Sequence, residues 1–318
     1  MSAILDIRDL SVAWMTPSGP LHAVEDFSLS IAPGEIVGLV GESGSGKSTA
    51  MLAAIRALPA PGVITSGSVT FEDREVLSMD EAELRRLRWR GISLVPQSAL
   101  SALNPVLTIG AQIADTLYAH GQTDSIAARS EELMRLVEVD PIHLRSHPHQ
   151  LSGGMRQRIA VALALALDPP MVIMDEPTTA LDVVVERQIL RRILALRAAR
   201  GFSILFITHD LSLLMAFADR VAVLYAGRLV EVADSETIRA GGQHPYTQGL
   251  IRSIPRLHGD MSDVRGIPGA PPSLRSLPTG CRFHPRCSHA TPDCAHAVPL
   301  LRSIGTAHDA ACHLLEST

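Results

Sequence analysis

Residues 41–49 read GESGSGKST, directly after the short apolar run EIVGLV at 35–40 and before a helical pattern that begins at Ser48. The Gly-x4-Gly-Lys-Ser spacing predicts a Walker A loop, because its glycines allow consecutive backbone N–H groups to turn inward around phosphates. A helix N-terminus behind such a loop adds a favourable dipole for an anion. A strand, this loop and a helix in that order therefore predict a nucleotide phosphate site.

The side chains that would act on the nucleotide follow from this loop. Lys47 is expected to reach the β- and γ-phosphates and the Ser48 hydroxyl to bind Mg²⁺. The strand MVIMD at 171–175 supplies a Walker B pattern and places Asp175 at its C-terminal end, where a parallel sheet binds ligands. Glu176 follows and is placed to polarise an attacking water. The loop residues expected to bind the nucleotide are Gly41, Ser43, Gly44, Ser45, Gly46, Lys47, Ser48 and Thr49.

Strand and helix patterns alternate along the chain, which predicts an α/β fold with a parallel sheet and helices on both faces. Between about 99 and 150 no strand pattern appears, so this helical block is an insertion. After about 235 the composition shifts to Pro, Gly, His and Cys and periodicity fades, which predicts a separate small element. The other expected strands are 4–14, 24–31, 91–97, 203–208 and 221–225; the expected helices are 48–57, a short one capped by Asp80 and Glu83, 109–120, 125–138, Ser152 to Leu167, and two that begin at Asp182 and Asp210.

The composition excludes several classes of protein. With 46% hydrophobic and 19% charged residues in 318, the chain is not disordered. It has 28 Lys and Arg against 33 Asp and Glu, a net charge of −5, and 3% aromatics, which argues against a nucleic-acid surface. No apolar run reaches the roughly 18 residues of a membrane span, and the N-terminus MSAILDIRDL lacks the basic start of a signal peptide. We expect a cytosolic protein that binds no nucleic acid.

The stretch LSGGMRQR at 151–158 resembles the signature motif of ATP-binding cassette (ABC) ATPases. In that family the counterparts of Ser152, Gly153 and Gly154 contact the γ-phosphate held by a second subunit, and a second helix N-terminus aimed at the same anion is the physical reason. The resemblance covers about residues 4–235. It implies a P-loop ABC ATPase core: a RecA-like parallel sheet with flanking helices, an N-terminal antiparallel β part and an inserted helical subdomain.

Other residues match motifs of the same family in order. Gln97 matches the Q-loop glutamine, expected to contact Mg²⁺ and the attacking water, and His209 matches the switch histidine that reaches the γ-phosphate. Residues 180–182 match the D-loop, although Asp182 is equally explained as a helix N-cap. Trp14 lies where the family stacks an aromatic ring on adenine; the alternative is that it fills the face of the sheet.

Two classes of ABC protein compete for this chain. DNA-repair relatives insert a long coiled coil between Walker A and the signature, and no heptad run intervenes here. Translation-factor relatives carry two cassettes, whereas this chain has one Walker A motif. We therefore expect the ATP-binding subunit of a transporter, with a soluble ABC ATPase acting on nucleic acid or ribosomes as the alternative.

Stretches outside the shared motifs resemble the ATP-binding subunits of the oligopeptide/dipeptide/nickel importer family. They are LNPVLTIGAQI at 103–113, HPYTQGLIRSIP at 244–255, GIPGAPPSL at 266–274 and GCRFHPRC at 280–287. This resemblance implies a nucleotide-binding domain at 1–235, with a helical insertion at about 99–160, and a C-terminal extension of the oligopeptide-transporter type at 236–318.

The importer resemblance also implies a role and partners. It implies a peripheral subunit at the cytoplasmic face of the inner membrane that couples ATP hydrolysis to uptake of dipeptides or oligopeptides, with nickel or oligosaccharides as alternative solutes. The implied partners are a second ABC ATPase subunit, more often a paralogue, two transmembrane permease subunits and indirectly a solute-binding protein. One departure, Ser98-Ala99-Leu100 in place of an acidic-Pro-Met sequence, weakens any assignment to a substrate branch.

The four cysteines, Cys281, Cys287, Cys294 and Cys312, have the spacing C-x5-C-x6-C-x17-C. Because a cytosolic chain rarely keeps disulfides, their clustering predicts a metal or cluster site. The C-x2–4-C pairs of zinc ribbons are absent, and the importer resemblance implies a 4Fe–4S cluster. Zinc stays as an alternative because histidines crowd the same tail, and plain, metal-free cysteines are a further alternative. The histidines are His284, His289, His296, His308 and His313.

Overall fold

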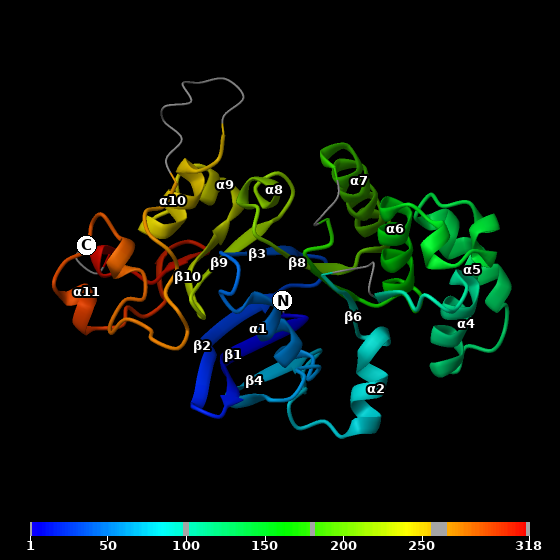
Figure 1. The fold of residues 1–318 in the computed structure, drawn as a ribbon, viewed down its shortest axis with the longest axis horizontal. Coiled ribbons are helices and arrows are strands. Elements are labelled where there is room, and N and C mark those ends of the chain that lie inside the picture. The colour runs from blue at the N-terminus through cyan, green and yellow to red at the C-terminus, as the bar shows by residue number, and fades with distance from the viewer. Residues whose placement is uncertain (1, 98–101, 179–181, 256–265, 316–318) are drawn as a thin grey trace. The chain divides into compact units, whose positions relative to one another are not determined.

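The computed structural model describes residues 2–97, 102–178, 182–255 and 266–315 (Figure 1). The chain divides into two compact units, each built from segments that are distant in sequence. None of the helices in the described ranges combines the length and apolar composition that crossing a bilayer requires. The first unit comprises Met1–Ile4, Ala32–Glu35 and Ser78–Leu205, and the second comprises Leu5–Ile31, Ile36–Leu77 and Phe206–Thr318.

An antiparallel sheet opens the second unit. Its order is β2-β1-β4-β5, and β1 pairs antiparallel with both β2 and β4. Alternating apolar residues of β1, among them Leu5 and Ile7, are buried beneath it, as the period-2 pattern predicts. This sheet is the antiparallel N-terminal β part expected from the sequence. Its strands are β1 (Leu5–Thr16), β2 (Gly19–Ile31), β4 (Gly62–Phe71) and β5 (Arg74–Glu75).

A second group of strands in this unit carries the Walker A loop. Strand β3 is buried along its whole length and runs parallel to β9, and the loop connects β3 to helix α1. Strand β10 pairs antiparallel with β9, and β12 and β11 extend the group from β10. The C-terminal region is thus joined to the cassette by strand pairing. The elements are β3 (Ile36–Val40), α1 (Lys47–Ala54), β9 (Arg220–Tyr225), β10 (Arg228–Asp234), β11 (Arg302–Gly305) and β12 (His308–Ala310).

Short helices complete the second unit. Helix α10 (Pro245–Arg252) begins with Pro at its first position, and the Nδ1 atom of His244 accepts a hydrogen bond from the backbone N–H of Tyr246, 3.0 Å away. Burial lowers the pKa of His244 to about 3, so the ring is neutral and Nδ1 is free to accept. The other helices are α8 (Leu211–Leu214), α9 (Ser235–Arg239) and α11 (Asp293–His296).

The first unit combines parallel strands with a group of helices. Strand β6 runs parallel to β7, and helices α4, α5 and α6 contact one another, while α7 packs on α6 (Figure 1). The helical block predicted from the sequence is confirmed by α4 and α5. Strand β8 (Ser203–Thr208) leads from this unit into the second. The elements are α2 (Glu81–Arg90), β6 (Ile92–Val95), α4 (Ile109–Ala119), α5 (Ile126–Leu136), α6 (Gly153–Ala164), β7 (Met171–Asp175) and α7 (Val183–Arg200).

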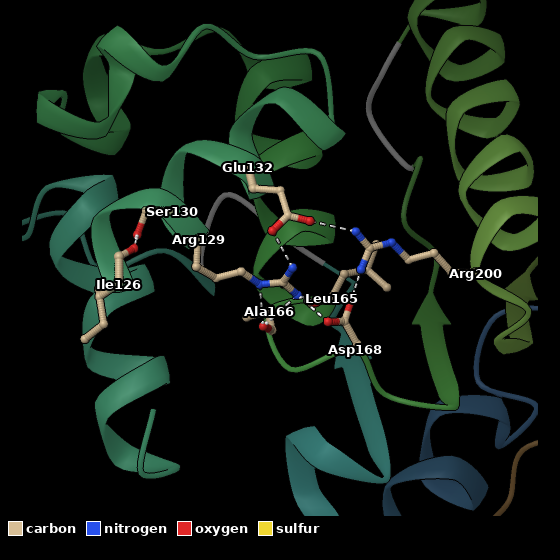
Figure 2. A network of polar contacts seen from close by, with 8 residues as sticks. All are labelled: Ile126, Arg129, Ser130, Glu132, Leu165, Ala166, Asp168 and Arg200. Atoms are coloured by element: carbon tan, nitrogen blue, oxygen red, sulfur yellow. Dashed lines mark hydrogen bonds and ion pairs between the residues drawn. The ribbon is translucent and has the colours of Figure 1, made fainter. Parts of the chain in front are cut away.

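A ring of alternating charges joins α5, α7 and the turn after α6 (Figure 2). Arg129 donates to Glu132 at 2.8 Å and to Asp168 at 2.7 Å, and Arg200 pairs with the same two carboxylates. Arg129 also donates to the carbonyl of Ala166 at 3.0 Å. The hydrogen bond from Arg129 is the main cause that lowers the pKa of Glu132. Because each carboxylate has two guanidinium partners, the ring holds the three segments in one arrangement.

Replacing Arg129 with Ala should destabilise this unit by about 1–3 kcal/mol, because two carboxylates and the carbonyls of Leu165 and Ala166 lose a charged donor. The matched control is Arg135→Ala on the same helix, because the Arg135 side chain is 63% exposed and pairs with Glu131 at 2.6 Å. That change should stay within about 0.5 kcal/mol. Thermal unfolding of both variants measures the difference. Equal unfolding midpoints for the two variants would show that the ring adds nothing.

Candidate nucleotide site

The Walker A loop is shaped by close approaches of backbone to backbone. Gly46, which precedes α1, has a φ of 103°, and a Cβ built on it would lie 2.5 Å from the carbonyl oxygen of Ala23. A Cβ on Gly41 would lie 2.2 Å from the carbonyl oxygen of Leu224. Real Cβ atoms do not approach other atoms so closely, so glycine is required at both positions. The loop therefore has the tight, side-chain-free backbone that a phosphate cradle needs.

Lys47 lies inside this cradle. Its ammonium donates to the carbonyl oxygens of Gly41, at 2.8 Å, and Glu42, at 3.1 Å, and the residue is only 5% exposed. Ser48 and Thr49 occupy the first turn of α1 and are half-buried. A fixed ammonium and a helix N-terminus on one loop form an electropositive site that fits a polyphosphate. The cradle and donor set of the second unit thus suit the phosphates of ATP.

Walker B and the Q-loop residue lie in the first unit. Asp175 ends β7, whose five residues are all buried. Glu176 follows with a φ of 45°, a left-handed conformation that is strained for a residue with a side chain. The Nε2 atom of Gln97 donates to Oε2 of Glu176 at 3.1 Å, so these two predicted catalytic residues are in direct contact. An oriented carboxylate of this kind can accept a proton from water.

The signature motif begins a helix in the same unit. Ser152 is the N-cap of α6, and its hydroxyl accepts a hydrogen bond from the backbone N–H of Met155 at 3.3 Å. Gly153 and Gly154 form the first turn, and a Cβ on Gly154 would lie 2.9 Å from Val185 on α7. The small residue lets α6 and α7 approach closely. The first turn of α6 therefore carries almost no side chains, so an anion could approach its backbone N–H groups.

Asp182 acts as a helix cap in this chain. Its carboxylate accepts hydrogen bonds from the backbone N–H groups of Val184 and Val185, both at 3.0 Å, at the start of α7. The two preceding D-loop residues, 180–181, and the Ser98-Ala99-Leu100 departure lie outside the described residues. The structure thus supplies the capping role that the sequence left as an alternative for Asp182.

His209 and Trp14 belong to the second unit. His209 follows β8 directly and is exposed. Trp14 lies on β1, half-buried, opposite Leu21 of β2 and Gly62 of β4. Leu21, the β2 residue paired with Trp14, lines a cavity together with loop residues Glu42 to Ser45. The strand beside Trp14 therefore lies next to the Walker A loop.

The four cysteines are free and gather in the C-terminal region. Cys294 is buried, the other three are half-buried, and the backbone N–H of Cys281 donates to the carbonyl of Cys294 at 2.8 Å. Burial is the main cause that raises the pKa of Cys281, to about 11, and neighbouring thiols add to it. In the part of the chain that the structure describes, however, no three Cys, His, Asp or Glu side chains converge to hold a metal ion. The predicted 4Fe–4S cluster and its zinc alternative are therefore not supported by this geometry.

Three of the tail histidines have structural contacts. Nε2 of His308 lies 2.8 Å from Oε1 of the buried Glu231. A ring nitrogen of His284 lies 2.9 Å from the carbonyl of Cys281, and one of His313 lies 2.9 Å from that of Ala297. Contacts within the folded C-terminal region thus explain the positions of these three histidines.

Sequence reasoning missed the residues that hold the loop from outside. Glu42 lies within GESGSGKST but matches no required position, and it forms an ion pair with Arg286 in the C-terminal region. Arg286 lies inside GCRFHPRC and Tyr246 inside HPYTQGLIRSIP. Both stretches indicate the importer family, but neither predicts a contact with the loop. No spacing rule connects residues 244 positions apart, so the contact has no sequence signal of its own.

Comparison with known proteins agrees with this fold. The family "ABC transporter" matches residues 24–179, and the family "Oligopeptide/dipeptide transporter, C-terminal region" matches residues 230–294. The chain resembles the dimeric structure of a post-hydrolysis state of the ATP-binding cassette MJ0796 bound to ADP and Pi, with a TM-score of 0.65 and 27% identity over 73% of this chain and 98% of that one. The fold and the loop thus define a P-loop ATPase of the ABC class.

Relatives of known name give the narrower placement. The chain is 43% identical to the dipeptide transport ATP-binding protein DppD of Caldanaerobacter subterraneus subsp. tengcongensis, over 99% of this chain and 98% of that relative. It is 41% identical to the oligopeptide transport ATP-binding protein OppD of Escherichia coli, over 91% and 86% of the two chains. The chain belongs to the family of ABC transporter ATP-binding proteins, within its DppD/OppD group. The predictions of an ABC ATPase core and of ATP hydrolysis are confirmed.

A matched pair of glycine substitutions tests the close approach at the loop. Gly46 and Gly19 have similar φ values, 103° and 111°, but a Cβ on Gly19 meets nothing within 4 Å. Gly19→Ala should lose only about 1–2 kcal/mol of stability to backbone strain. Gly46→Ala should lose about 1–3 kcal/mol more, because Ala23 must move, and its MgATP binding should fall sharply. Thermal unfolding and nucleotide titration measure both. Equal losses in the two variants would contradict the role of the close approach.

Proposed function

We propose that this chain is the ATP-binding and ATP-hydrolysing subunit of a bacterial ABC importer that takes up dipeptides or oligopeptides. One observation carries the proposal: the cassette and the oligopeptide/dipeptide-type C-terminal region occur on one chain, and that chain matches DppD over nearly the whole length of both. Nickel and oligosaccharides are the alternative solutes.

The proposed chemistry assigns a role to each part of the site. Lys47 and the loop N–H groups bind the β- and γ-phosphates, and Ser48 and Asp175 would hold Mg²⁺, which when bound would supply positive charge to the phosphoryl group. Glu176 accepts the proton of the attacking water, and the hydrogen bond from Gln97 orients its carboxylate. His209 contacts the γ-phosphate, and Trp14 stacks on adenine.

The proposed partners complete the site and use its energy. A second cassette, more often a paralogue, presents its Ser-Gly-Gly helix N-terminus to this Walker A loop, while Ser152, Gly153 and Gly154 serve the partner's nucleotide. Two transmembrane permease subunits receive the motion of the helical group, and a solute-binding protein delivers the peptide. The chain then works as a peripheral subunit on the cytoplasmic face of the membrane.

Reconstitution with the permease subunits tests this function. ATP hydrolysis should rise when a peptide-loaded binding protein is added to the assembled complex, and labelled peptide should accumulate inside vesicles.

Glu176→Gln should lower turnover by about 10²–10⁴ while MgATP binding persists, because only the general base is lost. Glu131→Gln on α5, a half-exposed carboxylate paired with Arg135, is the control and should behave as wild type. A chain that sediments with ribosomes or DNA and ignores the permeases would overturn the transporter assignment.

We also propose, as a finer point, that the four cysteines bind a 4Fe–4S cluster. The proposal is supported by their shared position in the C-terminal region, and it requires the thiols to converge on binding. Thiolate ligands are the donor set that such clusters use. No step of ATP hydrolysis is assigned to the cluster.

Metal analysis of protein purified without oxygen tests the cysteine proposal. About four irons per chain and a brown colour are expected, both lost in Cys287→Ser. Ser288→Ala, at a neighbouring position that is not a cysteine, is the control. About one zinc per chain would support a tetrahedral site instead, and native protein with four freely alkylated thiols and no metal would refute both.

A further inference from the structure

Glu42, the second residue of GESGSGKST, is bound by the C-terminal extension. Nη1 of Arg286 lies 2.8 Å from Oε2 of Glu42, and Nη2 lies 3.0 Å from Oε1, so the two groups form a bidentate pair. The Arg286 side chain is 6% exposed and that of Glu42 is 27% exposed. A bidentate pair fixes direction as well as distance, and a buried one is screened little by salt.

Arg286 is itself held in place on every side. Its Nε donates to the carbonyl of Pro268 at 2.8 Å, and Nη1 donates to the hydroxyl of Tyr225 on β9 at 3.2 Å. Its guanidinium carbon lies 5.8 Å from the centre of the Tyr225 ring, within the range of a cation–π contact. The planar fork therefore has a single orientation, aimed at Glu42.

The backbone of Glu42 has a second contact with the extension. Its N–H donates to the hydroxyl of Tyr246 at 3.1 Å. Tyr246 is fully buried on α10, and its ring packs against Tyr225 and Phe283 with centroid separations of 4.6 and 5.4 Å. An aromatic cluster thus fixes the acceptor. Both ends of Glu42, side chain and N–H, are held by residues outside the loop.

The same residue contacts the phosphate-binding lysine. The carbonyl oxygen of Glu42 accepts a hydrogen bond from Lys47, at 3.1 Å. The segment 271–275 of the extension also lines a cavity with Glu42, Ser43, Gly44 and Ser45. A movement of Glu42 would therefore be transmitted to the ammonium that is placed to receive the phosphates.

We propose that the C-terminal extension positions the Walker A loop through Glu42, with Arg286 as the main positioning residue, and thereby sets the affinity of the cassette for MgATP. The pair also neutralises a carboxylate beside the phosphate cradle, which would otherwise repel the nucleotide. The inference rests on the proposed role of the loop in binding ATP. It assigns to the extension a part in the nucleotide site that does not depend on any metal in the cysteine region.

The test compares MgATP dissociation constants of purified variants of the full chain, measured by calorimetry. Arg286→Met leaves the Glu42 charge beside the cradle and should weaken binding at least about fivefold. Glu42→Gln also loses the bidentate contact, but it leaves no carboxylate beside the cradle, so it should weaken binding less than Arg286→Met does. The double variant Glu42→Gln/Arg286→Met should bind more tightly than Arg286→Met and no more weakly than Glu42→Gln, because Arg286 acts through Glu42; a purely structural role of Arg286 would add its loss to that of Glu42→Gln. In the assembled complex the KM for ATP should rise while kcat changes less than about twofold.

Two further variants keep the test decisive. Arg228→Met removes another partly buried arginine, which pairs with Glu25 and Asp26 on β2, and it should leave MgATP affinity unchanged. Tyr246→Phe removes only the hydroxyl that accepts the hydrogen bond from the Glu42 N–H. It should weaken MgATP binding and speed amide exchange at residues 42–47. If Arg286→Met does not fold, this variant still tests whether the extension positions the loop.

Three outcomes would overturn the inference. Unchanged affinity in both Arg286→Met and Tyr246→Phe removes the coupling between extension and loop. A loss in Arg286→Met that Glu42→Gln does not repair shows that Arg286 does not act through Glu42. Wild-type protein that binds no MgATP overturns the proposed function and the inference with it, whereas wild-type affinity retained by all variants overturns the inference alone.

Discussion

Three backbone segments meet at the Walker A loop with no side chain between them, and the second unit depends on this contact. Gly46 lies against the carbonyl of Ala23 on β2, and a Cβ on Gly227 would lie 2.6 Å from the same carbonyl. Gly227, in the turn between β9 and β10, donates to the carbonyl of Ser45 at 2.8 Å and accepts from Glu25 at 2.9 Å. The loop therefore takes its shape from two groups of strands that are distant in sequence, so the phosphate cradle forms only when both are in place.

A buried carboxylate keeps the C-terminal extension on this framework. Glu231 on β10 is completely buried, and it accepts hydrogen bonds from the backbone N–H groups of Gln243, at 2.6 Å, and His244, at 3.0 Å. His308 on β12 is its third partner. A buried carboxylate is tolerated only when its oxygens are well satisfied, so the start of α10 and strand β12 must both return to β10. That requirement brings Tyr246 to the loop.

The sequence predicted best the features that depend on near neighbours in the chain. The Asp80–Glu83 capping box is present, with both reciprocal hydrogen bonds, because every partner lies within three residues. Helix α6 was expected to reach Leu167 on its apolar run, but it ends at Ala164, where Arg129 from α5 binds the following carbonyls. The cysteine spacing predicted a cluster, yet spacing carries no information on how thiols are aimed. Contacts between distant segments, such as the charged ring and the pair at Glu42, require the tertiary structure.

The contact between Glu42 and Arg286 affects nucleotide binding because it changes the charge beside the phosphate cradle. Lys47 places a positive charge in the cradle, and the carboxylate of Glu42, a residue of the same loop, carries the opposite charge. Arg286 restores the balance, since its fork engages both carboxylate oxygens. In a partly buried site such charges interact several times more strongly than in bulk water. In the proposed binding mode, Lys47 leaves the carbonyls of Gly41 and Glu42 for phosphate oxygens, and a Glu42 held at both ends keeps those carbonyls from following it. The ammonium then exchanges partners over a fixed backbone, so little reorganisation opposes nucleotide binding.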